Sequence, residues 1–399
     1  MGEIYINPKK SFNLLSQIWD KQETRAVIIQ IITITIVFSL LALVIQNVMT
    51  NLKMIGKEFS FSFLFSPAAY DITFSPFIEY NSRSTHLRAA IVGILNTLLV
   101  AVTGIALATV MGFMMGILRL SSNWLVNKIV YSFLEFTRNV PVLIHILFIH
   151  GLVVIHLPVP KMAHNFADTI FLTNRGLFIP KPVWEPGAWL VGLVFLFSII
   201  MVIGFKKWAK KTQDETGRVY PVFWISVSII CSLTLISFLA AGLPISWDTP
   251  SLKGFNFKGG ISIKPEFIAL WLALSYYTSC FIAEIVRAGI LAISSGQTEA
   301  AYSLGLRPNR TLQLIIIPQA LRVIVPPLAS QYLNLTKNSS LAIAIGYMDV
   351  VATVGGITLM QTGKEMETMI IVLLTYLTFS LLISGFMNWY NKKMALKER

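Results

Sequence analysis

Charged side chains are scarce in this sequence. Of its 399 residues only 13% are Asp, Glu, Lys or Arg, whereas 55% are hydrophobic. In ordinary soluble domains, charged residues make up about 25%. Several apolar runs reach the roughly 20 residues that a helix needs to cross a bilayer. This composition excludes an ordinary soluble domain and predicts an all-α membrane protein with the lipid bilayer as its surroundings.

Cysteines are rare, and a nucleotide-binding loop is lacking. The two cysteines, Cys231 and Cys280, lie in apolar segments without metal-ligand spacing, so we expect two buried small side chains and no metal site. The sequence contains no GxxxxGK[ST] motif, the loop that cradles nucleotide phosphates. We therefore expect this chain to bind no cofactor and to catalyse no ATP hydrolysis.

The charges that are present indicate topology. The net charge of +13 would favour nucleic acid as the partner of a soluble protein, but here we attribute it to loops next to the membrane and expect no nucleic-acid partner. With a cytoplasmic N-terminus, 19 Lys and Arg fall inside and 12 fall outside, as the positive-inside rule requires. The inside segments are 1–25, 118–138, 206–220, 287–318 and 391–399. Both termini are therefore predicted to be cytoplasmic.

Eight spans are predicted, at about 26–47, 91–117, 139–157, 188–205, 221–242, 267–290, 319–343 and 367–390. The first is expected to be a retained anchor, because polar residues 1–25 precede it and no small-residue cleavage site follows it. In the seventh, Pro326 and Pro327 remove two backbone donors and should bend the helix. The polar TKNSSL stretch after them is a possible start of a separate helix.

The outside loops at 48–90 and 158–187 are long and rich in aromatic residues. Two interpretations are open. Their Trp, Tyr and Phe side chains lie at the membrane interface, or the loops dock an extracytoplasmic partner. We favour the first.

One polar segment, 294–318, interrupts the apolar spans on the cytoplasmic side. Thr298 is expected to cap a short helix, in which Ala300 and Ala301 permit close approach of another surface. Gly305 fits the left-handed position that closes such a helix, and a second helix is expected from about Asn309. By its physical chemistry alone, the segment is either an amphipathic connector or a rigid element that docks another protein.

The order of residues in this segment carries a resemblance. Glu299, Ala300, Ala301, Gly305, Ile315, Ile317 and Pro318 have the identities and spacing of the coupling loop of ATP-binding-cassette importer permeases, with Ile in place of the usual Leu before the proline. The stretches 93–143, LTKNSSLAIAIGYMDVVATVGG and TYLTFSLLISGFMNWYNKK are similar to the polar amino acid branch, above all to permeases of general L-amino acid importers. The resemblance covers about 88–160 and 262–393.

The resemblance implies a type I importer permease fold and a permease subunit in the bacterial inner membrane that forms the path for amino acids. It implies three kinds of partner: an ATPase subunit dimer that binds ATP, a second homologous permease and a periplasmic amino acid binding protein. Glu299, Ala300, Ala301, Gly305 and Pro318 would couple to the ATPase. The extra helix 26–47, the loop 48–90 and the insertion 161–261, with two extra spans, depart from the short five-span members.

Polar residues within the spans are candidate functional groups. Glu284 and Arg287 are three residues apart on one helix face. They form either a structural ion pair or a pair that senses the opening of a gate. The three histidines His145, His150 and His156 have spacings that do not suit a metal site, so we expect them to hydrogen-bond between helices. Asn96, seven residues before Thr103, either lines the path or joins helices.

The NLTKNSSL stretch is the strongest candidate for the path of a zwitterionic substrate. Lys337 would meet a carboxylate, and the neighbouring groups offer both donors and acceptors. The candidates are Asn334, Lys337, Asn338, Ser339 and Ser340. Related permeases usually carry an acid where Asn338 stands, so a fixed negative contact is not expected here. The alternative is an interfacial helix start with Asn338 or Ser339 as its cap.

Overall fold

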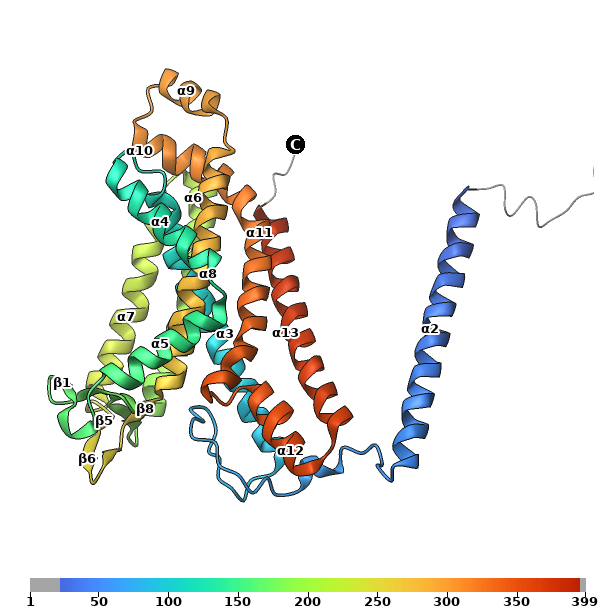
Figure 1. Ribbon diagram of the computed structural model, residues 1–399. Helices are drawn as coiled ribbons and strands as arrows, with labels where there is room; N and C mark the ends of the chain where they lie inside the picture. The colour runs from blue at the N-terminus through green and yellow to red at the C-terminus, as the bar shows by residue number, and fades with distance from the viewer. Residues whose placement is uncertain (1–21, 395–399) are drawn as a thin grey trace, which may run out of the picture.

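The computed structural model describes residues 22–394 and is built mainly from helices (Figure 1). Seven of the helices that it describes are long and apolar enough to cross a membrane. They are α2 (Gln22–Met54), α3 (His86–Leu118), α6 (Ala188–Thr216), α7 (Val222–Ala240), α8 (Pro265–Leu291), α11 (Ile317–Asn338, within an apolar run from Pro308 to Ile345) and α13 (Glu365–Met394). The predicted class of helical membrane protein is confirmed.

The third predicted span, 139–157, differs from the structure. The chain breaks between α4 (Trp124–Asn139) and α5 (Val142–His156), which meet at 106°. At this break Val140 has extended backbone and is followed by Pro141. Proline disfavours helical backbone in the residue before it, which is why α4 ends here. Neither α4 nor α5 alone is long and apolar enough to cross a membrane, but the two together are. Counted as one broken span, they bring the total to the predicted eight.

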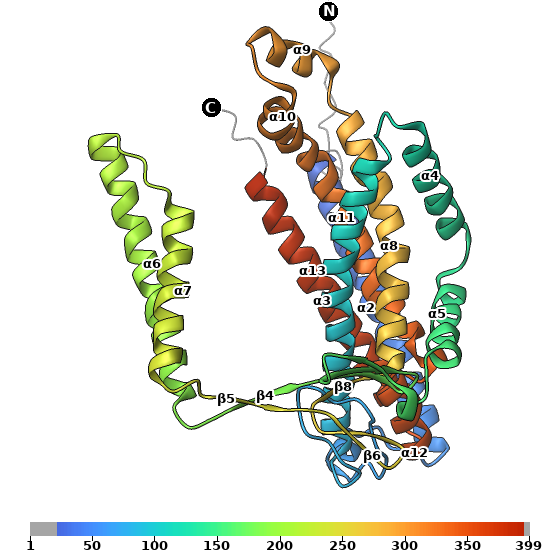
Figure 2. The same cartoon turned by 90° about the vertical axis from the view of Figure 1, so that its left-hand side faces the viewer.

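The centre of the bundle is the crossing of α3 with α8, flanked by α11 and α13 (Figure 2). Small residues let the two backbones approach closely. A Cβ atom on Gly112 would lie 2.5 Å from Ile282 Cγ2, and one on Gly116 would lie 2.7 Å from Val286 Cβ. Close approach over small residues is a common way in which membrane helices pack, because apolar burial between helices drives little association in lipid.

The seventh predicted span begins earlier and ends differently. α10 (Pro308–Thr311) and the π-helical η3 (Leu312–Ile316) lead directly into α11, and both Pro326 and Pro327 lie inside α11. TKNSSL starts no new α-helix. Instead α11 ends at Asn338 and tightens into the 3₁₀ helix η4 (Ser339–Ile345), followed by the π-helical η5 (Val351–Thr358) and the short α12 (Leu359–Thr362). The span is therefore broken near the end where η4 begins.

The 161–261 insertion contains short strands that the sequence reading did not include. A four-stranded antiparallel sheet has the order β1-β2-β3-β8, with Leu177 opposite Ile263. Two two-stranded ladders pair β4 with β5 and β6 with β7. The bounds are η2 (Pro160–Met162), β1 (His164–Phe166), β2 (Ile170–Thr173), β3 (Gly176–Ile179), β4 (Lys181–Trp184), β5 (Ile245–Asp248), β6 (Ser251–Lys253), β7 (Asn256–Lys258) and β8 (Ile261–Ile263).

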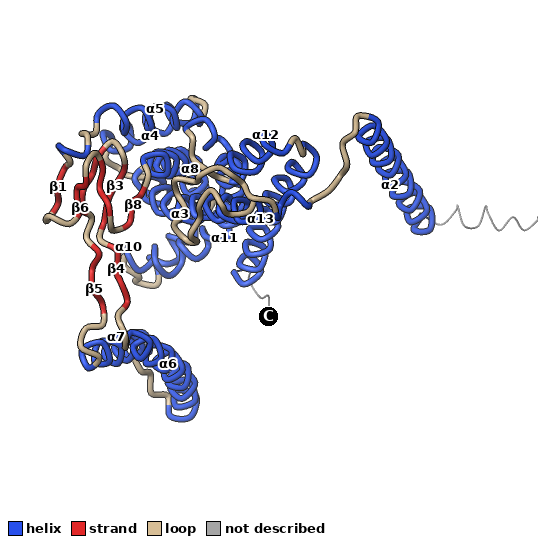
Figure 3. Tube along the Cα trace, turned by 90° about the horizontal axis from the view of Figure 1, so that it is seen from below, coloured by secondary structure: helices blue, strands red, loops and turns tan. Residues whose placement is uncertain are grey.

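Helices α6 and α7 form a hairpin that lies apart from the bundle at the end of the β4–β5 ladder (Figures 2 and 3). Cys231 on α7 is exposed, so the expectation that it is buried was wrong, whereas Cys280 on α8 is buried as expected. Helix α2 also lies apart from the bundle, and none of its residues is buried (Figure 1). The apolar surfaces of these three helices face away from the rest of the described chain.

The loop between α2 and α3, which contains the 3₁₀ helix η1 (Ser62–Phe65), is bonded to the end of the bundle where α13 begins. Lys57 forms an ion pair of 2.7 Å with Glu365, and the Ser60 N–H donates to Glu367 Oε1 at 2.8 Å. The ring of Phe74 is 7% exposed and packs against Phe267. The prediction that the aromatic residues of this loop lie at the membrane interface is therefore wrong for Phe74.

Candidate functional site

The 294–318 segment begins with a nine-residue helix, α9 (Ser295–Ser303), at the end of the molecule where α2 starts and α13 ends (Figure 1). Its N-cap is Ser294, whose side chain accepts from the Gly296 N–H. The prediction that Thr298 caps the helix was wrong. Ser294 offers the same hydroxyl acceptor four residues earlier, and the helix starts there.

The C-terminus of α9 is closed by Gly305, which has a left-handed φ of +76° as predicted. The Gly305 N–H donates to the Tyr302 carbonyl at 2.9 Å, and the Leu306 N–H donates to the Ala301 carbonyl at 3.1 Å. These two bonds form a Schellman motif, which satisfies carbonyls that a helix end otherwise leaves free. The chain leaves α9 in one fixed direction.

The surface of α9 combines polar and apolar groups. Glu299, Ala300 and Gly305 are exposed as a docking role requires, but Ala301 is buried and packs inward. The sequence reading missed Leu304, whose side chain is 80% exposed at the end of the helix. Its only sequence signal is an apolar residue directly before the closing glycine. Tyr302 beside it is 49% exposed, so the end of α9 presents apolar surface.

The segment is mechanically joined to a membrane span. Gln319 on α11 donates through Nε2 to Gln297 Oε1 on α9 at 3.2 Å. From Pro308 the chain then runs without a break through α10, η3 and α11 to Asn338. Pro318 lies in the first turn of α11, at the junction with η3, where it removes one backbone donor from the continuous helix. α9 is thus linked to α11 both along the chain and through the bond between Gln297 and Gln319.

The ion pair predicted within α8 is present. The side chain of Arg287 donates to Glu284 Oε1 through Nε at 3.0 Å and through Nη2 at 2.5 Å. The two side chains are about one-third exposed, at 30% and 34%. They lie in the last turns of α8, directly before the 294–318 segment.

The residues of NLTKNSSL lie in different surroundings. Asn334 and Lys337 are exposed, and Asn338 and Ser340 are half-buried. Ser339 is fully buried and donates to the Thr336 carbonyl at 2.7 Å, so the structure contradicts its place on the path. The alternative of a helix start capped here was also wrong: Asn338 makes no side-chain capping bond, and α11 ends there.

Asn96 has a structural role. Its side chain is fully buried, and Nδ2 donates to the carbonyls of Phe74 and Met348, each at 2.9 Å. The assignment of Asn96 to the path was therefore wrong, because the loop between α2 and α3 and the chain after η4 enclose it. Thr103 bonds its own helix by donating to the Leu99 carbonyl.

A buried acid that the sequence reading missed lies between the spans α11 and α13. Asp349 is fully buried, accepts from the Ala352 N–H at 2.8 Å and accepts from the Tyr376 hydroxyl at 3.2 Å. Asp349 lies directly before η5 and bonds its first turn. An Asp before an apolar run is the sequence signal that indicates such a cap.

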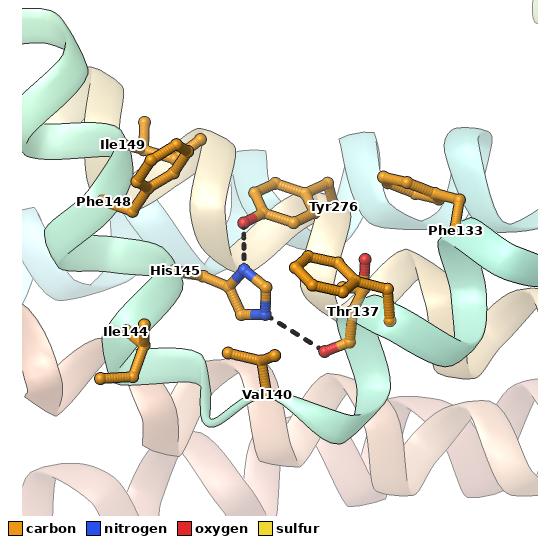
Figure 4. Close-up of a pocket in the computed structure, with 9 residues that line it drawn as sticks. Phe133, Thr137, Val140, Ile144, His145, Phe148, Ile149 and Tyr276 are labelled. Carbon is orange, nitrogen blue, oxygen red and sulfur yellow. Dashed lines mark hydrogen bonds between the residues drawn. The ribbon is translucent and has the colours of Figure 1, made fainter.

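His145 fulfils the predicted hydrogen-bonding role. It lies in a largely apolar pocket of about 540 Å³ where α4 bends into α5 (Figure 4). Its Nδ1 and the Tyr276 hydroxyl of α8 are 2.6 Å apart, and its Nε2 lies 3.1 Å from the Thr137 carbonyl. The first bond joins the broken span to α8, and the second joins α5 to α4. Within residues 22–394, no group of three or more His, Cys, Asp or Glu side chains is arranged to hold a metal.

Known proteins match this chain over most of its length. The family model "Binding-protein-dependent transport system inner membrane component" matches residues 104–396. The chain is 46% identical to the general L-amino acid transport system permease protein AapQ of Rhizobium johnstonii, covering 94% of this chain and 93% of the relative. It is 45% identical to the glutamate/glutamine/aspartate/asparagine transport system permease protein BztB of Rhodobacter capsulatus, covering 98% of each.

A solved structure of an amino acid ABC transporter with histidines aligns with 77% of this chain and 95% of its own, at 19% identity and a TM-score of 0.45. The family assignment does not depend on it, because the family match spans more than half of the chain and two relatives cover nearly all of it. The chain therefore belongs to the family of binding-protein-dependent transport system inner membrane components, and is a multi-pass inner-membrane permease of an ABC transporter.

Proposed function

We propose that this chain is a subunit of an ATP-driven importer of amino acids, in which it forms part of the path across the membrane. The names of its relatives AapQ and BztB support amino acids as the substrates. The exposed α9, closed by the turn at Gly305, carries the proposal that an external motor drives transport, because the chain after this turn runs through α10 and η3 into the span α11. The chain is a transport subunit and not an enzyme.

Three partners complete this proposal. An ATPase subunit dimer binds the surface formed by Glu299, Ala300 and Gly305 on the cytoplasmic side, with Leu304 as an apolar contact. A second homologous permease covers the path side of α11, and a periplasmic binding protein delivers the substrate. Both termini are then cytoplasmic, as the lysine-rich end of α6 also favours. ATP binding must favour one of two permease states through contacts that differ between them.

Uptake by reconstituted vesicles tests this function. Vesicles that contain the permease pair, with ATPase, binding protein and ATP supplied, should accumulate amino acids, and uptake should stop when the ATPase is omitted. The competing function is a secondary transporter, which uses an ion gradient and needs membrane carboxylates for coupling. Glu284 is already paired with Arg287. Transport that persists without the ATPase and follows a proton or sodium gradient would contradict the proposal.

A further inference from the structure

The outer half of α11 has a polar face that the described chain leaves uncovered. The exposed positions recur every three or four residues, and the opposite face, with Leu328 and Leu335, is buried. The polar face consists of Ser330, Gln331, Asn334, Lys337 and Asn338. None of these five side chains has a hydrogen bond or ion pair to another residue within 22–394. Polar groups on a membrane span ordinarily face a water-filled path or polar protein.

The chain directly after this face leaves the α-helix. α11 ends at Asn338, η4 is a 3₁₀ helix, and residues 346–350 lie between the end of η4 and the start of η5. Non-helical backbone at membrane depth is tolerated only where protein buries it or where it lines a water-filled cavity. Tyr347, Asp349 and Val350 are buried, so protein encloses this break, whereas Lys337 before it is exposed.

Lys337 carries the only charge on this face, and the acids around it are otherwise engaged. α3 and α11 contain no acid. Of the acids on the other packed elements, Glu284 pairs with Arg287, Glu365 pairs with Lys57, Glu367 accepts from Ser60 N, and Asp349 is buried against Tyr376. Glu266, at the outer start of α8, forms no ion pair with Lys337. The face therefore presents an uncompensated positive charge.

We infer that Lys337 makes this face a charge filter, which passes amino acids with neutral or anionic side chains and disfavours those with cationic side chains. The inference rests on the proposed import function and names its substrate class. Every amino acid brings a carboxylate that Lys337 attracts, and the amide oxygens of Asn334 and Asn338 can accept from the ammonium group. A second positive charge on the side chain is repelled, since no acid offsets Lys337.

Glutamate and glutamine test the filter because they have nearly the same size and differ in charge. Uptake of each is measured in vesicles that hold the permease pair, the ATPase and the binding protein. Since every variant receives substrate from the same binding protein, that protein's preference cancels in the variant-to-wild-type comparison. Lys337→Gln should lower the glutamate-to-glutamine uptake ratio roughly three- to tenfold. Lys337→Arg should retain the ratio, and Asn338→Asp, which adds an acid beside Lys337, should lower it.

The outcomes separate the filter from the import function. A wild-type complex without ATP-dependent uptake overturns import itself. ATP-dependent uptake with an unchanged ratio in Lys337→Gln overturns the filter and leaves import standing. Co-purification of the two permeases is measured for each variant: if Lys337→Gln separates them, the face is a packing surface and the filter is overturned. An unchanged complex with a lowered ratio supports it.

Discussion

The Leu306 N–H donates to the Ala301 carbonyl across Gly305, at a distance of 3.1 Å. Gly305 is exposed, and a Cβ atom placed on it would meet no atom within 4 Å. The glycine is therefore required by its backbone conformation and not by lack of space. This distinction makes the closing turn of α9 testable by substitution.

Gly305→Val should abolish uptake while leaving membrane insertion intact. A left-handed backbone costs a residue with a Cβ roughly 1–2 kcal/mol, and a β-branched side chain resists it further, so the turn should open and displace α9. Uptake and ATPase co-purification are the measurements. Gly305→Asn is the matched control, because asparagine tolerates this conformation, and it should retain most activity. Normal transport by the valine variant would disprove the docking role of this turn.

Leu304→Asp should weaken ATPase binding without unfolding the permease. Leu304 is 80% exposed, so the substitution disturbs no core, but it places a charge in an apolar contact with the partner. Glu215→Lys, also a charge change on the predicted cytoplasmic face and 61% exposed, is the control and should leave binding intact. Pull-down of the ATPase measures both. Equal retention by the two variants would show that α9 is not the docking surface.

Local chemistry was sufficient to predict much of α9 and of the ion pair. The left-handed backbone of Gly305 and the ion pair between Glu284 and Arg287 were confirmed. Each depends only on near neighbours: a glycine that follows a short helical run, and an acid three residues before an arginine. The prediction that Thr298 is the cap failed because three hydroxyl residues, Ser294, Ser295 and Thr298, lie near the start of one helix. The cap depends on where the chain leaves α8, which the sequence of α9 does not contain.

The errors at Asn96 and Ser339 have another cause. Asn96 is a polar residue within a span, which fits either a place on the path or a hydrogen bond inside the protein. Its hydrogen bond to the Phe74 carbonyl decides for the second. Phe74 lies in a loop whose fold depends on packing against α8. Ser339 is buried because the end of α11 tightens into η4 and turns it inward. Such tertiary contacts follow from the whole fold and from no local pattern.

Gly116→Ala should destabilise the bundle by about 1–3 kcal/mol, as overpacking does. The added Cβ would lie 2.8 Å from the Ala283 carbonyl oxygen and 2.7 Å from Val286 Cβ, so backbone must move. Gly192→Ala on α6 is the control, because a Cβ there meets nothing within 4 Å, and alanine is the better helix former. Thermal unfolding in detergent should show a lower midpoint only for Gly116→Ala, and equal midpoints would refute this close packing.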